Sequence, residues 1–480
     1  MSKRREFIKS SIIAAASVSM GKILFPVRTF GSAVGRSIPA FAKSLLKPKL
    51  IAEDVVYKYL PADNGAGPMW CGGSTCLVRI GKRVFASGLE TVPQWKPMNN
   101  CRWMLFERSK NSWKQLLVDK GRTREPSPVA SFHNGQLILS ANTSLAKPED
   151  YSGPAVPEIL IFNSADAYEP VERTKPVWAD NQKFTEHSYR SLASDGNRGE
   201  MILFQNIGDS HSAWTFRDAD GKWSAQGTLD WPWGAEYEKP EPIRVCYPNV
   251  MLKDRAVYFC GVSDIIEPRK AWREYKKQLT GRDWDYDFRR LFFTWNDDIT
   301  KEKFHSWIEI SSREETCGWV NPCDLWVADN GDVHIIWNER AIDERLREKF
   351  FPDAKQSNSL NYAVIRKGEV VLRRTLINAE EGSKIKPGAA RFQVLPDNSL
   401  VVIYFMSGTD NEGNPFAENR IMTLSPEGVT GESVKLPLKQ PLSSFFTATV
   451  RAGSKKSTTI DMLGTPAGAR TTISYACIEL

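Results

Sequence analysis

A short apolar run, a tight polar turn and a second run of apolar residues alternating with small or aromatic ones recur about seven times along the chain. Alternation with a period of two is typical of a half-buried β-strand, and two such runs across a turn predict a β-hairpin. The turns lie roughly 53 to 76 residues apart, a spacing that indicates a radially repeated architecture. The hairpins cover residues 77–88, 128–142, 191–206, 247–261, 324–339, 392–407 and 449–464.

Second hairpins of similar size lie between the first ones, at residues 102–118, 212–229 and 360–377. Two hairpins per unit form a four-stranded antiparallel sheet, which is the blade of a β-propeller. The last unit is short, and residues 51–59 near the start of the chain would complete its sheet and close the ring. We therefore expect an all-β fold, a seven-bladed β-propeller of four-stranded antiparallel blades.

Two charged segments with helical spacing, residues 267–288 and 339–351, directly follow the second strand of a hairpin. In a propeller, the segment that leads into an inner strand and the segment that leaves the next strand share one rim. The two helical insertions and the Pro-rich loop 142–157 are therefore expected on one face. Long loops gathered on one face of a rigid scaffold commonly carry function.

The first residues of the chain do not share this pattern. Residues 2–9, SKRREFIK, resemble a twin-arginine export signal, and the apolar stretch 12–27 is too short and too polar to span a membrane. Residues 40–42 provide a small-x-small cleavage site. We expect an export signal at 1–42, a single propeller domain at 43–480 and a periplasmic or secreted protein; an ordinary basic leader is the alternative.

The charge of the chain argues against a nucleic-acid partner. The formal net charge is +7, and seven Lys and Arg residues lie within the leader, so the remainder is close to neutral. No basic run resembles a nucleic-acid-binding patch. The chain is rich in aromatic residues, with 16 Trp, 23 Phe and 13 Tyr, which suit packed sheets and also stack on sugar rings.

Eight Cys residues leave two interpretations open. An exported protein can form disulfides, and three pairs are placed for bridges: 71 with 76, 317 with 323, and 246 with 260 across one hairpin. The alternative is that most of the cysteines are small buried apolar residues. Their spacing does not match a zinc site.

Candidate functional residues follow from the position of each hairpin relative to the rim. Of five His residues, His187 and His211 flank one hairpin at the functional rim, whereas His133, His305 and His334 have structural positions in a turn, a connector and a strand. Tyr247 opens the next hairpin. The rim also provides seven candidate substrate-binding residues: Tyr189, Arg190, Asn206, Arg244, Glu339, Arg340 and Arg391.

The hairpins resemble those of BNR-repeat, sialidase-like propellers. The two His residues around one hairpin, followed by Tyr247-Pro248, are similar to seven-bladed polysaccharide lyases such as the ulvan lyases. After the Tyr-Pro hairpin, where these lyases carry an Arg, this chain has Ser263 and Asp264. The resemblance implies β-elimination on a uronate-containing polysaccharide, with His187, His211 and Tyr247 as catalytic residues.

The chemistry of that reaction agrees with the residue types at the rim. Elimination across a uronic-acid glycosidic bond needs a cation or strong donors on the carboxylate, a base for the C5 proton and an acid for the leaving oxygen. The pKa of His lies near neutrality, which suits a base, and Tyr can donate or accept a proton where nearby cations lower its pKa. The planar fork of Arg binds both oxygens of a carboxylate.

Two other function classes remain open. A glycoside hydrolase needs two carboxylates about 5 to 9.5 Å apart, and Glu90, Asp264, Glu339 and Asp410 all lie on the expected rim. The Ser-x-Asp-x-Gly-x-x-Trp boxes typical of sialidases are degenerate here; the best match is 217–223. A non-catalytic carbohydrate- or protein-binding propeller is the third class.

The sequence contains no phosphate-binding loop, dinucleotide fingerprint or metal-ligand cluster. We therefore expect no cofactor and no metal. The expected partner is an acidic polysaccharide or oligosaccharide, and the expected oligomeric state is a monomer.

Overall fold

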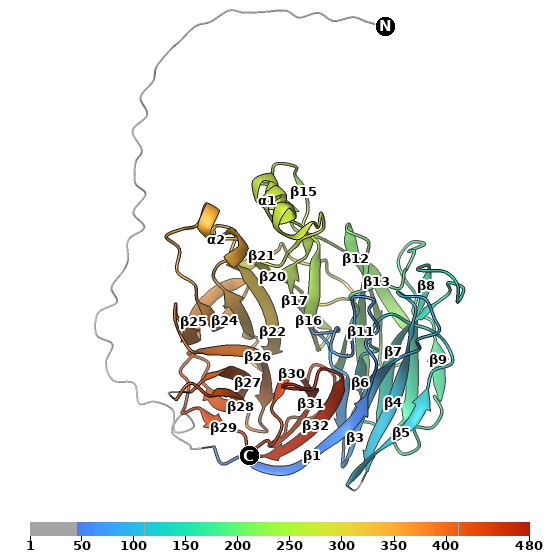
Figure 1. Ribbon diagram of the computed structural model, residues 1–480. Helices are drawn as coiled ribbons and strands as arrows, with labels where there is room; N and C mark the ends of the chain where they lie inside the picture. The colour runs from blue at the N-terminus through green and yellow to red at the C-terminus, as the bar shows by residue number, and fades with distance from the viewer. Residues whose placement is uncertain (1–45, 110, 411) are drawn as a thin grey trace, which may run out of the picture. The chain divides into compact units, whose positions relative to one another are not determined.

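Seven four-stranded antiparallel sheets follow one another around a ring (Figure 1). The structure, a computed structural model, describes residues 46–480 apart from residues 110 and 411, so the expected export signal at 1–42 lies outside the described residues. In six of the seven sheets the strands follow each other in chain order from the inner to the outer edge. The seven-bladed β-propeller predicted from the hairpin repeat is confirmed.

The strands of the first three blades are β2 (Leu77–Ile80), β3 (Arg83–Thr91), β4 (Cys101–Ser109) and β5 (Ser112–Val118); β6 (Val129–Ser131), β7 (Gln136–Ser144), β8 (Ala155–Asn163) and β9 (Glu172–Thr174); β10 (Ser191–Asp195), β11 (Glu200–Ile207), β12 (His211–Arg217) and β13 (Trp223–Asp230). Blades four to six contain β16 (Val245–Lys253), β17 (Ala256–Ser263), β20 (Arg290–Asn296) and β21 (Ile308–Ser312); β22 (Trp319–Val327), β23 (Val333–Arg340), β24 (Asn358–Arg366) and β25 (Glu369–Ala379); β26 (Ile385–Val394), β27 (Leu400–Thr409), β28 (Pro415–Leu424) and β29 (Val434–Lys435). Blade seven contains β30 (Leu442–Thr447), β31 (Thr459–Pro466), β32 (Thr472–Glu479) and β1 (Lys49–Lys58). Two small sheets pair β14 (Trp233–Gly234) with β15 (Glu241–Pro242) and β18 (Ile265–Ile266) with β19 (Tyr286–Asp287).

Burial of the strands decreases from the inner to the outer edge of a blade. In blade three, the inner strand β10 is buried on both faces along most of its length, whereas the outer strand β13 alternates half-buried and exposed residues. Both faces of an inner strand are covered by neighbouring blades, and sheets covered on both faces are apolar throughout. Large aromatic side chains fill the space between blades, as where the ring centroids of Phe204 and Phe259 lie 5.2 Å apart.

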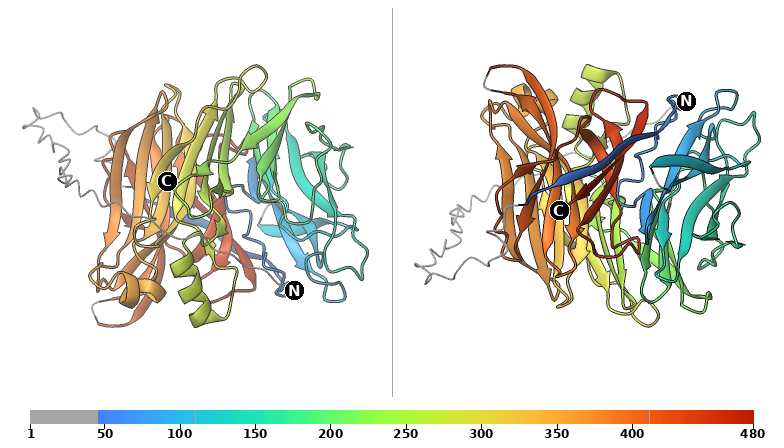
Figure 2. Two further views of the ribbon diagram at one scale, coloured as in Figure 1. Left: turned by 90° about the horizontal axis from the view of Figure 1, so that it is seen from above. Right: turned by 90° about the horizontal axis from the view of Figure 1, so that it is seen from below.

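Blade seven is built from both ends of the described chain. β1 pairs antiparallel with β32, from Lys49 opposite Glu479 to Lys58 opposite Thr472, and Figure 2 shows the blue β1 against the red strands. The hydroxyl of Tyr57 in β1 also accepts a hydrogen bond of 3.1 Å from the backbone N–H of Leu89 in blade one. The strand predicted at 51–59 therefore closes the ring and joins blade seven to blade one.

Removing β1 should open this ring. A chain that starts at residue 59 leaves the edge of β32 unpaired, and an open sheet edge invites aggregation. We expect a lower Tm and more aggregation, measured by differential scanning fluorimetry and light scattering, than for a matched chain that starts at residue 46. Equal Tm values for the two chains would contradict the closing role of β1.

The two predicted helical segments are confirmed as α1 (Lys270–Thr280) and α2 (Glu344–Phe350), which lie side by side (Figure 1). The rings of Trp272 and Phe351 pack edge to face, with centroids 5.4 Å apart. Below the helices, the guanidinium of Arg289 makes two hydrogen bonds of 2.8 and 2.9 Å to the carboxylate of Glu267. The Nζ of Lys276 in α1 donates to Glu267 at 2.8 Å, so a buried ionic network fixes α1 to the blade.

At the inner edges of the blades, one buried cation connects several strands. The guanidinium of Arg451 donates to Oδ1 of Asp324 at 2.7 and 2.9 Å, and the two residues are 3% and 1% exposed. It also donates to the carbonyl oxygens of Gly73 at 2.9 Å and Val250 at 3.2 Å. Arg451 thereby joins blades four, five and seven to the segment that precedes blade one.

Candidate functional site

Four aromatic side chains meet at the mouth of the ring. Trp70 precedes blade one, His187 and Tyr189 precede blade three, and Tyr247 lies at the start of β16 in blade four. The Trp70 ring centroid lies 5.3 Å from that of His187, 4.7 Å from that of Tyr189 and 5.7 Å from that of Tyr247. His187 and Tyr189 are 4.6 Å apart, and Tyr189 meets Tyr247 edge to face at 5.3 Å. We call these four residues the mouth cluster.

Both tyrosines of the mouth cluster have left-handed backbone conformations. The φ angle is 44° at Tyr189 and 51° at Tyr247. Bulky residues adopt this region at a cost of order 1–3 kcal/mol, and such strain gathers at functional sites. At Tyr247 the cause is a β-bulge, because the register of β16 with β17 shifts between Cys246 and Asn249. The bulge redirects the Tyr247 side chain toward the mouth.

Two guanidinium groups border the cluster. The Cζ of Arg124 lies 5.3 Å from the centroid of Trp70, and the Cζ of Arg244 lies 5.5 Å from that of Tyr189. Arg244 is held by hydrogen bonds to the backbone oxygen of Asp264 at 2.9 Å and to its carboxylate at 3.1 Å. A further ion pair joins Arg244 to Asp209. The sequence prediction that Arg244 lies at the mouth agrees with this arrangement.

The imidazole of His187 is neutral at physiological pH. Burial lowers its pKa from 6.5 to about 3, and the positive charges of Arg124 and Arg244 contribute in the same direction. Its Nε2 atom is buried and has no hydrogen-bond partner among the described residues. The ring therefore has an unprotonated nitrogen available and no internal partner for Nε2.

The phenols of the cluster stay protonated. Burial raises the pKa of Tyr189 and of Tyr247, and the nearby Asp264 and Cys246 raise both further. The nearby cations therefore do not lower the pKa of Tyr247, in contrast to the condition considered from the sequence. A neutral phenol beside a neutral imidazole can donate a proton while the imidazole accepts one.

Acidification should destabilise the protein through His187. Its pKa is about 3 in the folded chain and about 6.5 when unfolded, so the unfolded state binds more protons between these values. The stability contributed by the neutral ring is present above pH 6.5 and is lost as the pH falls toward 3, on the order of a few kcal/mol. Urea unfolding of the wild type and of His187→Gln across this range should show a shallower pH dependence in the variant; parallel curves would contradict this assignment.

Three other predicted site residues bond to the protein itself. Arg190 is 4% exposed and donates to the carbonyl oxygen of Pro126 at 2.7 Å, while its Nε and Nη1 have no hydrogen-bond partner among the described residues. Arg391 donates to the backbone oxygens of Cys323 and Gly72 at 2.6 and 3.1 Å. The amide of Asn206 donates to the oxygen of Val245 at 3.3 Å. In this structure, these side chains connect blades at the mouth.

Three further predicted residues, Glu339, Arg340 and His211, make no ring contact or hydrogen bond with the mouth cluster within the described part of the chain. Glu339 accepts a hydrogen bond of 2.6 Å from Trp337 Nε1 and pairs with Arg313, whereas Arg340 is exposed at the end of β23. The Nδ1 of His211 is 2.8 Å from the hydroxyl of Ser210, and its Nε2 is buried without a partner among the described residues. No ring contact joins His211 to the mouth cluster within residues 46–480, leaving out 110 and 411.

Trp70, Arg124 and Glu125 were not among the residues predicted from the sequence. These residues precede the inner strands of blades one and two, just as His187 and Tyr189 precede blade three. Residues that directly precede a hairpin are expected at the rim. The same expectation, applied to the first two hairpins, identifies these three residues. The carboxylate of Glu125 accepts hydrogen bonds from the N–H and hydroxyl of Ser188 at 2.8 and 2.6 Å, and burial raises its pKa although Arg190 and Arg124 oppose the change.

A cavity of about 200 Å³ opens beside the mouth cluster and is lined by Trp70, Tyr247, Asn321 and Arg391, among others. A much smaller cavity, of about 10 Å³, lies against Tyr189 and Arg190. The first cavity can hold part of a ligand next to the cluster, and the second has room for little more than a water molecule.

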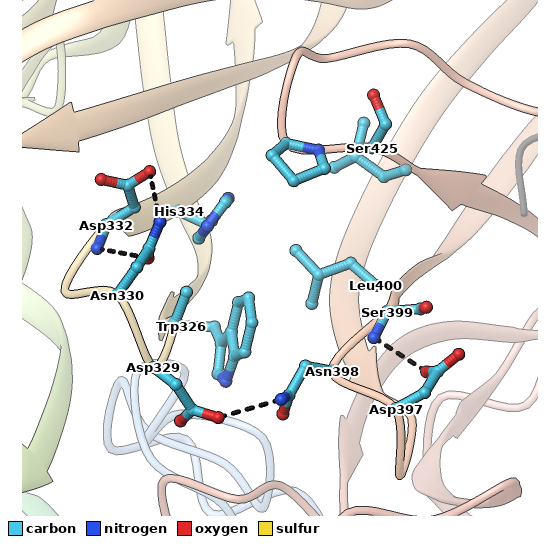
Figure 3. Close-up of a pocket in the computed structure, with 13 residues that line it drawn as sticks. Trp326, Asp329, Asn330, Asp332, His334, Asp397, Asn398, Ser399, Leu400 and Ser425 are labelled. Carbon is cyan, nitrogen blue, oxygen red and sulfur yellow. Dashed lines mark hydrogen bonds between the residues drawn. The ribbon is translucent and has the colours of Figure 1, made fainter. Parts of the chain in front are cut away.

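A larger cavity of about 370 Å³ lies between blades five and six (Figure 3). It is lined by the turns β22–β23 and β26–β27, which lie at the opposite ends of the inner strands from the mouth cluster. Trp326, His334 and Leu400 form its walls. The polar side chains at its rim are largely hydrogen-bonded to other protein groups. For example, the amide of Asn398 donates to Asp329 at 2.9 Å. Within the described part of the chain, the mouth cluster is the stronger candidate because its polar atoms include unpaired ones.

Among residues 46–480 other than 110 and 411, no group of three or more His, Cys, Asp or Glu side chains is arranged to hold a metal ion. In the same part of the chain, none of the helices has the length and apolar character needed to cross a membrane.

Comparison of the sequence with protein-family models and with curated proteins finds no match. Solved structures with a similar chain path include a protein of unknown function from Dyadobacter fermentans, with 9% identity, a TM-score of 0.43 and 90% of this chain and 99% of that chain covered. An α-L-arabinanase of Penicillium chrysogenum has 10% identity and a TM-score of 0.41, covering 90% and 98% of the two chains. The polysaccharide lyase Uly1 has 8% identity and a TM-score of 0.35, covering 72% and 88%. Likenesses at this level carry no argument about activity.

Proposed function

We propose that the protein cleaves a uronate-containing polysaccharide by β-elimination at the mouth cluster. The observation that carries the proposal is the state of His187: a neutral imidazole with an unpaired Nε2, next to protonated phenols and two guanidinium groups. A base, an acid and cations within one aromatic site are the groups that this elimination needs.

Each group has a defined step in the proposed reaction. The Nε2 of His187 accepts the C5 proton of the uronate, and Arg244 and Arg124 stabilise the negative charge that develops on its carboxylate. The Tyr247 hydroxyl then donates its proton to the oxygen of the leaving sugar as the bond from C4 to that oxygen breaks. The products are a shortened chain and an unsaturated uronyl end.

The position of Trp70 imposes a condition on this reaction. The Nε2 of His187 is buried, and the Trp70 ring lies 5.3 Å from the imidazole. We therefore propose that the Trp70 side chain moves aside when substrate binds and then stacks on a sugar ring. Tyr189, Arg190, Asn206 and Arg391 are proposed to shape the binding surface around it.

Glycoside hydrolysis is the second candidate, and Glu125 is the observation that favours it. Its carboxyl has a raised pKa and lines the small cavity shared with Tyr189 and Tyr247, as a general acid would. Three of the four carboxylates expected on the rim are paired with a guanidinium, since Asp264 binds Arg244, Glu339 binds Arg313 and Glu90 binds Arg102. A hydrolase needs a second free carboxylate at the site, so elimination agrees better with the arrangement. A propeller that only binds carbohydrate is the third candidate.

The test uses purified protein and a panel of uronate-containing polysaccharides, with ultraviolet absorbance and reducing ends followed together. Both signals rising in step would support elimination. Reducing ends without absorbance would overturn it in favour of hydrolysis, and binding to the polymer without either signal would favour a binding propeller.

We further propose, from the sequence alone, export through the twin-arginine-type signal and a monomeric state. Size-exclusion chromatography with light scattering tests the monomeric state.

A further inference from the structure

The segment that carries Trp70 also contains two cysteines in contact. The Sγ atoms of Cys71 and Cys76 lie 3.4 Å apart, and the backbone N–H of Ser74 donates to the oxygen of Cys71 at 2.8 Å. This turn brings the two thiols together across four intervening residues. No other pair of thiols is in contact in the part of the chain that the structure describes.

The residues between the two cysteines are held in place. A Cβ on Gly73 would lie 2.0 Å from the oxygen of Pro248, so the loop backbone packs directly on blade four. The Ser74 hydroxyl accepts from the N–H of Leu192 at 3.1 Å, and the Thr75 hydroxyl donates to the oxygen of Thr447 at 2.9 Å. The thiols therefore meet because of the fold around the loop and not through a chance rotamer.

The two thiols differ in accessibility and charge. Cys71 is half-buried and lines the small cavity of the mouth, whereas Cys76 is 2% exposed. The hydrogen bond from Cys71 lowers the pKa of the Cys76 thiol, burial opposes this, and Ser87 and the Arg190 guanidinium lower it further. The same hydrogen bond and burial raise the pKa of Cys71. Cys76 is therefore the thiol that ionises first, and Cys71 is the thiol that an outside molecule can reach.

We propose that Cys71 and Cys76 are a redox pair that forms a disulfide by exchange with a small-molecule disulfide. Cys71 passes its proton to the Cys76 thiolate, and the more exposed Cys71 sulfur attacks the small disulfide, which forms a mixed disulfide and releases one thiolate. That thiolate takes the proton from Cys76, and the Cys76 thiolate then attacks the Sγ of Cys71 and releases the second thiolate. Two protein thiols are oxidised and one external disulfide is reduced to two thiols, so atoms and electrons balance. The Sγ atoms, now 3.4 Å apart, approach by about 1.4 Å to reach the length of a disulfide bond.

The bond would constrain the mouth cluster. Cys71 directly follows Trp70, and a link to Cys76 at the start of blade one fixes the chain on that side of the indole. The oxidised protein would then hold the Trp70 backbone in place.

The test treats the full chain with oxidised glutathione under native conditions, blocks free thiols after unfolding, and maps the peptides by mass spectrometry. The expected result is one internal disulfide between Cys71 and Cys76, seen as the loss of two hydrogens, with the other six cysteines blocked. Both cysteines blocked, or a bridge to any other cysteine, would overturn the proposal. The readout does not depend on catalytic activity, so it stands apart from the test of β-elimination.

Two variants test the order of attack. Cys76→Ser lacks the second thiol, so a glutathione adduct should accumulate on Cys71. The matched variant Cys71→Ser retains only the buried thiol, and its adduct should form at least tenfold more slowly. Equal rates of adduct formation in the two variants would contradict the assignment of Cys71 as the attacking thiol.

Discussion

Replacing Arg451 by Met lowers the free energy of unfolding by about 3–5 kcal/mol, the usual cost of removing one partner of a buried ion pair. The substitution leaves the carboxylate of Asp324, which is 1% exposed, without its guanidinium. It also removes the hydrogen bonds to the oxygens of Gly73 and Val250, so two segments lose a shared donor. Urea or thermal unfolding, followed by tryptophan fluorescence, measures the loss.

A second variant and a surface control make this prediction specific. Arg451→Met combined with Asp324→Asn removes the buried charge and should recover part of the loss. Lys277→Met removes a surface pair, since the side chains of Lys277 and Asp283 are 55% and 69% exposed, and should cost no more than about 1 kcal/mol. If Arg451→Met cost no more than Lys277→Met, the connecting role of Arg451 would be wrong.

Replacing His187 by Ala should reduce kcat/KM for polysaccharide cleavage by about 10²- to 10⁴-fold, the usual contribution of a general base. The Tm at neutral pH should change little, because the buried imidazole gives up no hydrogen bond from Nε2 within the described residues. His305 provides the matched control, since its ring stacks on Trp295 at 4.1 Å, away from the mouth cluster. The proposed base would be disproved if His305→Ala and His187→Ala lost activity equally.

Tyr247→Phe completes this test because it keeps the ring and removes only the hydroxyl. The aromatic contact of 5.3 Å with Tyr189 is preserved, so a loss of activity with unchanged Tm would identify the missing proton donor.

His211→Ala tests whether His211 is catalytic, as the resemblance to lyases implies, or lies outside the site, as its position in the structure indicates. A small effect is expected from the structure, and a loss as large as that of His187→Ala would return His211 to the catalytic set.

The hairpin repeat was enough to predict the blades and the closing strand, and helical spacing was enough to predict both helices. Each of these depends on local alternation, turn residues and spacing, which a sequence displays directly. The partner of each rim side chain depends on residues far away in the chain. Arg391 bonds to Gly72, over 300 positions earlier, and Glu339 pairs with Arg313 in the connection from blade four. Spacing places such residues on the rim, but cannot show whether their charges are already engaged.

The backbone conformation and the protonation of Tyr247 also could not be predicted from the sequence, because both depend on packing. A left-handed Tyr247 results from a bulge in one blade, and its raised pKa results from burial near Asp264. By contrast, Trp70 and Arg124 occupy positions that the repeat itself defines. They lie in the segments of blades one and two that are equivalent to the segment of His187 and Tyr189 in blade three.

The pairing of β1 with β32 has a consequence for the order of folding. Lys49 and Glu479 are opposite each other in one sheet, so this contact joins nearly the full length of the described chain. Contacts between such distant residues form slowly, because the entropy of the intervening chain must be lost first. During synthesis, blades one to six can assemble in sequence while β1 stays unpaired. The ring can close only after the last strand has left the ribosome, which makes closure a late step in the folding of this protein.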